Sequence, residues 1–373
     1  MQKTKRDSKF ELLRIICMIL IVAHHLVCYG GYDYTSNIPF MNLALLRTFV
    51  VGGKLGVNIF VLIGAYFLVD KDFKLSKTIK LILQVFFYSM LFYLTFTLFG
   101  GYNFSVQEFF ANFFSVTVGK YWFITAYLIM YCLSPFINKL IKQLSQKEHK
   151  ILIIFLLFIQ CIVGIVYKNY LSNVGWFITL YLIAAYLKMY PNDDSKKITS
   201  IKINLLIFIV SFSATILFNV FLNVSFYSQT HLVNVASSIS LFNVFRNLKP
   251  FHSKFINTVS STTFGVYLIH ENGFMRNFIW QQTFKCGEMV YSNYFIPYAF
   301  GIVLLIFIAC SIIELCRIYL IEKPLIKCYE KFNLKKQEKL KEITSKIDNN
   351  ENSKIENNTQ NIEQNKNDEN KEK

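Results

Sequence analysis

The stretch FELLRIICMILIVAHH, residues 10–25, decides the class of fold, because it is almost entirely apolar yet carries Arg14 and His25. These two residues stand eleven positions apart. At about 100° per residue, eleven steps return to within about 20° of the same helix face, and a rise of about 1.5 Å per residue separates the two positions by about 16 Å. His24 is predicted to point away from that face.

Ionisable side chains are uncommon inside a membrane helix, since each costs about 2.5 kcal/mol or more on insertion. Such a residue usually faces the interior of the bundle or a watery cavity. His25 is therefore a candidate functional residue, and the alternative is a histidine that hydrogen-bonds to a neighbouring helix for packing. Glu11, one turn before Arg14, is a candidate ion-pair partner for it.

The whole chain has the composition of a multi-pass membrane protein. Of its 373 residues, 54% are hydrophobic and 17% are charged, with 38 Phe and 22 Tyr. This is too apolar for a soluble domain, so we expect an all-α polytopic helix bundle. Apolar stretches of about 20 residues predict about ten transmembrane helices. They lie near residues 10–29, 55–70, 78–98, 121–138, 151–167, 174–190, 203–222, 232–246, 257–274 and 296–319.

Basic residues are distributed unevenly between the predicted inner and outer segments. With a cytoplasmic N-terminus, the inner segments before the C-terminal tail hold 19 Lys and Arg, and the outer loops hold six. The six are Arg47, Lys54, Lys120, Lys168, Arg276 and Lys285. This bias predicts that both termini are cytoplasmic. The net charge of +16 then reflects topology and contact with anionic lipid, and no nucleic-acid partner is expected.

The predicted organisation is one transmembrane domain, residues 1–332, followed by a disordered polar cytoplasmic tail, residues 333–373. The tail is rich in Asn, Lys and Glu and has no aromatic residue. Glu11 and Arg14 argue against a cleaved signal peptide. The eight Cys form no CxxC or Cys/His metal spacing, so no metal site or bound cofactor is expected. The bias toward Asn, Lys and Ile indicates a bacterial source of low GC content.

Five stretches resemble, in order, the acyltransferase-3 family of integral-membrane acyltransferases, which modify hydroxyl groups of cell-surface carbohydrates and related acceptors. Residues 10–25 match the family's Arg-x10-His signature through Arg14 and His25. The others are GVNIFVLIGAYFL at 56–68, GKYWFITAYLIMYCLSPFI at 119–137, FGVYLIHE at 264–271 and IEKP at 321–324. The resemblance covers about residues 8 to 330.

The chain departs from the family pattern at two places. The usual Ser-Gly-Tyr is Gly64-Ala65-Tyr66, which removes a hydroxyl. The usual Arg-x-x-Arg at the start of the third span corresponds to Lys77 and Lys80. A lysine still neutralises phosphate but lacks the bidentate fork of guanidinium.

The resemblance implies transfer of an acetyl group from cytoplasmic acetyl-CoA, or of another acyl-CoA group, to a hydroxyl of a cell-surface or lipid-linked polysaccharide. His25 is the predicted general base, because the unperturbed pKa of histidine, about 6.5, lies near working pH. Arg14, Lys77 and Lys80 are the predicted donor-binding residues, through the phosphates of the acyl-CoA. The alternative for the two lysines is an ordinary role in the positive-inside bias.

Four further residues are candidates for the acceptor site. Tyr121 and Trp122 begin the fourth predicted span and could stack against a sugar, or belong to the aromatic belt of the membrane interface. His270 and Glu271 end the ninth predicted span, where Glu271 could orient an imidazole or the pair could simply face interfacial water. For Glu314 and Glu322 we expect salt bridges with Arg317 or Lys323 rather than catalysis.

The expected location is the cell (cytoplasmic) membrane, and the expected partners are the lipid bilayer, an acyl-CoA donor, a carbohydrate acceptor and polysaccharide-assembly proteins. The competing function is a proton-coupled transporter or lipid-linked sugar flippase, which would also suit buried His and Arg. Transporters usually show internal repeats with interrupted helices at corresponding positions, and the motifs of the first half have no counterpart in the second. A purely structural scaffold would leave the paired ionisable residues unexplained. The sequence does not name the glycan, the hydroxyl or the acyl chain.

Overall fold

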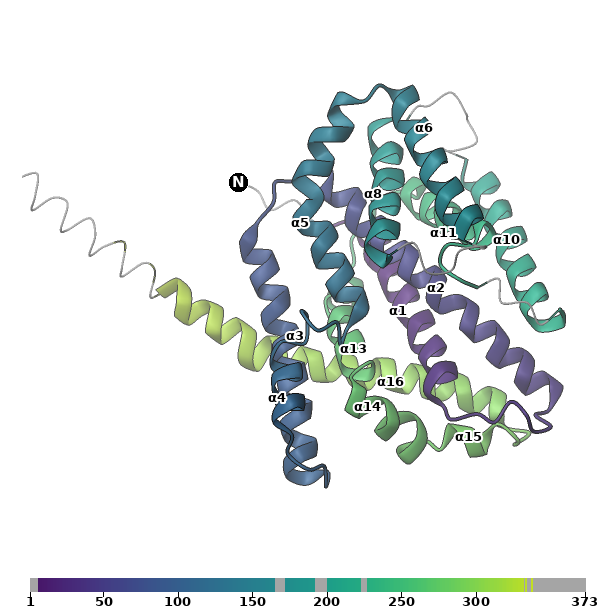
Figure 1. Cartoon of the computed structure of the whole chain (residues 1–373), viewed down its shortest axis with the longest axis vertical. Helices are drawn as coiled ribbons and strands as arrows, with labels where there is room; N and C mark the ends of the chain where they lie inside the picture. Colours follow the sequence, from purple (N-terminus) through teal and green to yellow (C-terminus); the bar gives the residue numbers. More distant parts are fainter. Residues whose placement is uncertain are drawn as a thin grey trace, which may run out of the picture. The chain divides into compact units, whose positions relative to one another are not determined.

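The computed structural model describes residues 6–164, 172–191, 200–222 and 227–331, together with positions 333 and 337. Every regular element in these residues is helical (Figure 1). The chain divides into two compact units, Met1–Ile312 and Ile313–Lys373, and each is described by itself. Nearly all of the predicted tail, residues 333–373, lies outside the described residues, so its disorder stays a prediction.

The helices of the first unit follow the predicted spans in order, with short helices between them. The long ones are α1 (Ser8–Tyr29), α2 (Phe40–Leu68), α3 (Leu75–Phe99), α5 (Trp122–Gln143), α10 (Ile201–Phe221) and α16 (Phe295–Arg317), whose last residues belong to the second unit. The shorter ones are α4 (Val106–Phe113), α6 (Gln146–Leu157), α8 (Asn173–Met189), α11 (Leu232–Asn247), α12 (Lys254–Ser260), α13 (Thr263–His270), α14 (Gly273–Asn277) and α15 (Cys286–Met289). Three π-helical turns also lie in the described ranges, namely η1 (Phe158–Val163), η2 (Phe278–Thr283) and, in the second unit, η3 (Ile318–Glu322). The chain continues as α-helix after η3, over residues 323–331.

Six helices within the described ranges are long and apolar enough to cross a membrane. They are α1, α2, α3, α5, α10 and the helix that begins at Phe295. The other four predicted spans correspond to helices that are shorter or interrupted, namely α6 with η1, α8, α11, and the series α12 to α14. The all-helical membrane class is therefore confirmed, whereas ten spans with both termini inside stay a prediction.

Two glycines let α1 and α2 approach closely. A Cβ atom at Gly53 would lie 2.3 Å from Cβ of His24, and one at Gly56 would lie 2.8 Å from the carbonyl oxygen of Cys17. Small residues at a helix interface are how membrane helices pack without a hydrophobic driving force between them. The helix α1 packs also against α11, α12 and α13, so its polar residues face protein on several sides.

The helix that carries the second predicted span, 55–70, begins well before residue 55, because α2 starts at Phe40. Adjacent glycines usually indicate a loop. Here Gly53 packs against α1 and the helix continues through it. Arg47 and Lys54, predicted to lie in an outer loop, are therefore helical residues of α2.

Some buried polar side chains of the shorter helices form hydrogen bonds to neighbouring helices. In α11, the Ser238 hydroxyl donates to the carbonyl oxygen of Asn234 at 2.7 Å. Asn58 of α2 donates to Ser238 at 3.3 Å and accepts from the Trp176 indole of α8 at 2.8 Å. Hydrogen bonds of this kind join helices where water is absent, which explains how a span that carries Ser and Asn is buried.

The ninth predicted span, residues 257–274, is broken into α12, α13 and α14. Its middle piece, α13, ends at His270 and packs against α1. The next helix begins after Asn272, whose side chain accepts a hydrogen bond from the Phe274 amide at 3.0 Å. The break therefore places His270 and Glu271 at a helix end that adjoins α1.

Candidate functional site

His25 of α1 meets the end of α13 inside the bundle. Its Nδ1 atom lies 2.8 Å from Nε2 of His270 and 3.1 Å from Oε2 of Glu271. The side chains are buried, with exposed fractions of 8% for His25, 0% for His270 and 3% for Glu271. His25, the predicted base, and Glu271, an acceptor-site candidate that could orient an imidazole, are thus in contact.

The hydrogen-bond partners assign the protons of this pair of histidines. Nδ1 of His270 lies 2.5 Å from the carbonyl oxygen of Val266, which only accepts, so this nitrogen carries the proton. In the neutral ring, Nε2 of His270 is then an acceptor, and Nδ1–H of His25 donates to it. The lone pair of His25 is left on Nε2, since the hydrogen bond that the ring forms within the described residues is at Nδ1.

The carboxylate of Glu271 is held from its other side by two residues. Tyr29 donates its hydroxyl to Oε1 at 3.1 Å, and the guanidinium of Arg276 forms an ion pair with the same oxygen. The Arg276 guanidinium also lies 4.4 Å from the centroid of the Tyr29 ring. A buried carboxylate needs such a charged partner, and here the partner leaves Oε2 directed at His25.

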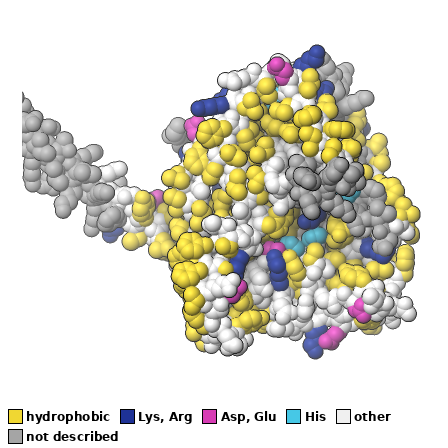
Figure 2. All heavy atoms as spheres, viewed as in Figure 1, with side chains coloured by type: hydrophobic (Ala, Val, Ile, Leu, Met, Phe, Trp, Pro, Cys, Tyr) yellow, Lys and Arg dark blue, Asp and Glu magenta, His cyan; other side chains and the backbone are white. Residues whose placement is uncertain are grey.

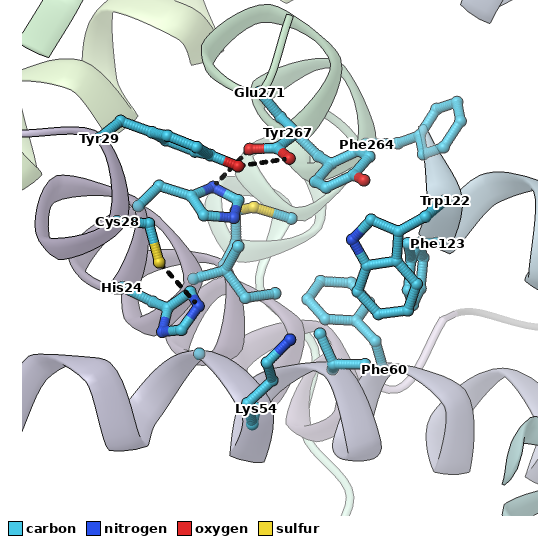
Figure 3. A pocket seen from close by; sticks show the side chains of 15 residues that line it. His24, Cys28, Tyr29, Lys54, Phe60, Trp122, Phe123, Phe264, Tyr267 and Glu271 are labelled. Atoms are coloured by element: carbon cyan, nitrogen blue, oxygen red, sulfur yellow. Dashed lines mark hydrogen bonds and ion pairs between the residues drawn. The ribbon is translucent and has the colours of Figure 1, made fainter. Parts of the chain in front are cut away.

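A cavity of about 220 Å³ lies against this cluster (Figure 3). His25, Tyr29 and Glu271 line one part of it, and Lys54 of α2 also lines it. Its aromatic wall is formed by Phe60, Trp122, Phe123, Phe264 and Tyr267. On the face drawn in Figure 2, basic, acidic and histidine side chains gather at one place within a largely hydrophobic surface. A small cavity with few polar groups is typical of a binding or catalytic site.

His24, predicted to lie off the helix face shared by Arg14 and His25, also lines this cavity. Both of its ring nitrogens are nevertheless engaged. Nδ1 donates to the carbonyl oxygen of Val50 at 2.8 Å, and Nε2 lies 3.3 Å from the Cys28 sulfur. Unlike His25, it has no ring nitrogen left for a substrate proton.

The comparison with known families gives the class of enzyme to which this cavity belongs. The model of the acyltransferase-3 family, described as an acyltransferase domain, matches residues 7–314. The chain belongs to this family. No curated protein and no solved structure matches the chain. The matched range contains every residue that lines the acyltransferase's cavity, whereas IEKP at 321–324 lies beyond it.

The predicted donor-binding residues of the acyltransferase lie away from the cavity lining. Arg14 forms an ion pair with Glu11 at 2.7 Å. This pair was predicted, because the two residues stand one helical turn apart. The other oxygen of Glu11 accepts a hydrogen bond from Ser260 at 2.5 Å. Lys77 and Lys80 are exposed at the start of α3. None of these three cations lines the cavity in the described part of the acyltransferase.

Positive charge nevertheless gathers near Arg14, between the end of α2 and the start of α3. Burial, followed by the nearby charges of Lys77, Lys188 and Arg14, lowers the pKa of Lys71. Lys188 in turn lies 2.5 Å from a carboxylate oxygen of Asp70. Arg14 and Lys77 were predicted from the sequence as donor-binding residues. The sequence gave no signal for Lys188, which lies on α8.

The two aromatic residues at the start of α5 lie in different surroundings. Trp122 belongs to the wall of the main cavity. Tyr121 is 2% exposed, donates its hydroxyl to the Leu268 carbonyl oxygen at 3.1 Å and accepts from Asn272 at 2.8 Å. It lines a second cavity of about 230 Å³, whose lining also includes Lys120 and Arg276. Tyr121 therefore supports the turn after α13.

The carboxylates near the C-terminus form the expected salt bridges. Within the second unit, Arg317 lies 2.7 Å from Glu314 and 2.7 Å from Glu322. The prediction of a structural ion pair for these residues is confirmed.

Proposed function

We propose that this acyltransferase transfers an acetyl group from acetyl-CoA to a hydroxyl of a cell-surface or lipid-linked carbohydrate, in the cell membrane, with His25 as the general base. The observation that carries the proposal is the engaged Nδ1 of His25, which leaves its Nε2 lone pair for a substrate proton at the cavity. Membership of an acyltransferase family supports this reaction over transport of a lipid-linked sugar.

The proposed reaction is a direct transfer. Nε2 of His25 removes the proton of the acceptor hydroxyl as its oxygen forms a bond to the thioester carbon, and the carbonyl electron pair moves onto its oxygen. The tetrahedral intermediate then collapses, the C–S bond breaks and the imidazolium returns the proton to the thiolate of CoA. General base catalysis of this kind typically contributes about 10² to 10⁴ in rate.

Glu271 and His270 act on the other nitrogen of the base. Nε2 of His270, 2.8 Å from Nδ1, accepts the Nδ1 proton and keeps it there before reaction, and the carboxylate of Glu271 lies 3.1 Å from the same atom. When His25 takes up the second proton, the carboxylate of Glu271 stabilises the imidazolium that forms. This arrangement follows the logic of a catalytic triad, in which an acceptor behind the base holds its tautomer.

The donor is proposed to bind through its phosphates at the cations near Arg14. The charges of Arg14, Lys77 and Lys188 around Lys71 support an anion-binding site there. Lys80, on the same helix face one turn after Lys77, is proposed to contribute. The helix rise places Arg14 about 16 Å from His25 along α1, a distance that the extended arm of acetyl-CoA can bridge.

The acceptor is proposed to approach beside Trp122, whose ring forms part of the cavity wall. The second cavity, lined by Lys120, Tyr121 and Arg276, supports a route for a polar molecule, because Arg276 also contacts Glu271. Polysaccharide-assembly proteins that deliver the acceptor are the proposed partners.

Membrane vesicles from cells of the organism that encodes the chain test this proposal. Vesicles with the parent protein, supplied with acetyl-CoA labelled in the acetyl group, should pass label to carbohydrate, and alkali should release it as acetate because the product is an ester. Vesicles that lack the gene should not. Equal labelling of carbohydrate with and without the gene contradicts the proposed function.

A further inference from the structure

Lys54 has no place in the proposed roles so far, yet its side chain extends from α2 into the catalytic cavity (Figure 3). Its Nζ atom lies 5.2 Å from the centroid of the Trp122 ring. The residue stands near the middle of α2, where a lysine is costly in a membrane protein. A cation at such a place usually has a partner or a function.

The charges of the cavity do not balance at rest. Glu271 is neutralised by Arg276, with which it forms an ion pair. Lys54 takes part in no ion pair within the described ranges of the chain, and its Nζ atom lies over the ring of Trp122. Since the wall is largely aromatic, the cavity carries one positive charge in surroundings of low polarity. An anion that formed in this cavity would be stabilised there more strongly than in water.

We propose that Lys54 is a catalytic residue that stabilises the oxyanion of the tetrahedral intermediate. The inference rests on the proposed acetyl transfer. As the acceptor oxygen bonds to the thioester carbon, the carbonyl electron pair becomes a negative charge on oxygen, and the Lys54 ammonium donates a hydrogen bond to it. At that moment His25 becomes positive beside the Glu271 carboxylate, and the new negative charge on oxygen forms beside the Lys54 ammonium. When the C–S bond breaks, the oxyanion returns to a carbonyl and Lys54 keeps its protons.

The lining of the cavity favours this role over binding of the donor phosphates. Phosphate binding would require several converging cations, whereas the cavity is lined by a single lysine and no arginine in the described chain. Lys54 is therefore suited to a charge that develops at the reacting carbonyl, where a preorganised donor contributes most.

The test is the rate of acetyl transfer in the same membrane vesicles, at varied acetyl-CoA concentration and per molecule of inserted protein. Lys54→Met removes the charge and keeps the length of the side chain. We expect kcat to fall about 10²- to 10³-fold, as for loss of one oxyanion donor, with KM for acetyl-CoA within about twofold of the parent. Lys54→Arg should retain more activity than Lys54→Met. Lys285→Met, the same substitution at an exposed lysine, is the matched control and should equal the parent.

A chemical rescue separates loss of charge from loss of structure. Lys54→Cys treated with bromoethylamine carries an ammonium on a side chain close in length to lysine. Its kcat should rise at least tenfold over that of the untreated variant. The parent protein treated in the same way should not gain activity. If parent vesicles transfer label and Lys54→Met has the kcat of the parent, the role of Lys54 is overturned and the proposed function is not. Failure of the alkylated Lys54→Cys variant to recover activity would also overturn the role of Lys54 alone. Parent vesicles that transfer no label would contradict the proposed function and the role of Lys54 with it.

Discussion

Oε2 of Glu271, just beyond the end of α13, lies 3.1 Å from Nδ1 of His25 on α1. In the proposed mechanism the carboxylate stabilises the imidazolium that forms during proton transfer, and an amide cannot. Glu271→Gln should therefore lower kcat for acetyl transfer by about 10² to 10⁴, the range lost when an enzyme loses the partner of its general base. KM for acetyl-CoA should change little, because the proposed site for the donor phosphates lies elsewhere.

The matched control for Glu271 is Glu288→Gln, at an exposed carboxylate 3.9 Å from Lys285. It should transfer acetyl at the parent rate. A Glu271→Gln protein with parent kcat at equal abundance in the membrane would show that the carboxylate has only a packing role.

Arg14 provides a test of the donor site that is independent of the chemical step. A charge-assisted hydrogen bond contributes about 1.5–3 kcal/mol, so Arg14→Ala should weaken binding of acetyl-CoA by about 10- to 100-fold. Arg14→Lys should weaken it less, and Lys77→Ala and Lys80→Ala least. Binding is measured by calorimetry on purified protein in detergent, with Lys139→Ala as a control that removes an exposed positive charge from α5. If Arg14→Ala binds acetyl-CoA as tightly as the parent, the donor site lies elsewhere.

Gly53→Ala tests the contact between α1 and α2. The new Cβ would lie 2.3 Å from Cβ of His24, so the helices must separate or the histidine must move. Such overpacking costs about 1–3 kcal/mol, and the apparent Tm of the purified protein should fall. Gly301→Ala, on the exposed side of α16 with nothing within 4 Å of the new Cβ, should leave the Tm unchanged or raise it slightly. Equal Tm values for Gly53→Ala and the parent would contradict this packing.

The predicted topology is tested by reporter fusions. The uneven distribution of Lys and Arg places the residues after Lys202 near the cytoplasm and those after Val224 outside, with α10 crossing between them. A phosphatase fused after Lys202 should be inactive and one fused after Val224 active. The opposite pattern would exclude the arrangement of ten spans with both termini inside.

Hydropathy predicted the helices well because each membrane helix must itself be a long apolar stretch, which can be recognised without knowing its neighbours. The predicted span 10–29 agrees with α1, and 203–222 agrees with α10. Predictions from the local sequence failed where packing against a neighbouring helix determines the secondary structure. Gly53 indicates a loop in isolation, yet it lies within α2 because α1 packs against it.

Individual residues of the candidate site could be predicted from the sequence, but the contacts between them could not. Helical periodicity and the family resemblance singled out His25, and the end of a predicted span singled out Glu271. Their contact depends on how α13 packs against α1, which no local pattern encodes. Lys54 was misplaced in a loop for the same reason, so its presence in the cavity had no signal in the sequence.

The central claim is that Nε2 of His25 is the general base. His24 is its internal control, because it lines the same cavity but has both ring nitrogens engaged, by Val50 and Cys28. The most direct measurement is the acetyl content of the surface glycan per molecule of membrane-inserted protein, in cells that carry either substitution to alanine. His25→Ala should reduce this content to the level of cells without the gene, and His24→Ala should keep much of it. Normal acetyl content in His25→Ala cells at equal protein abundance would contradict the account.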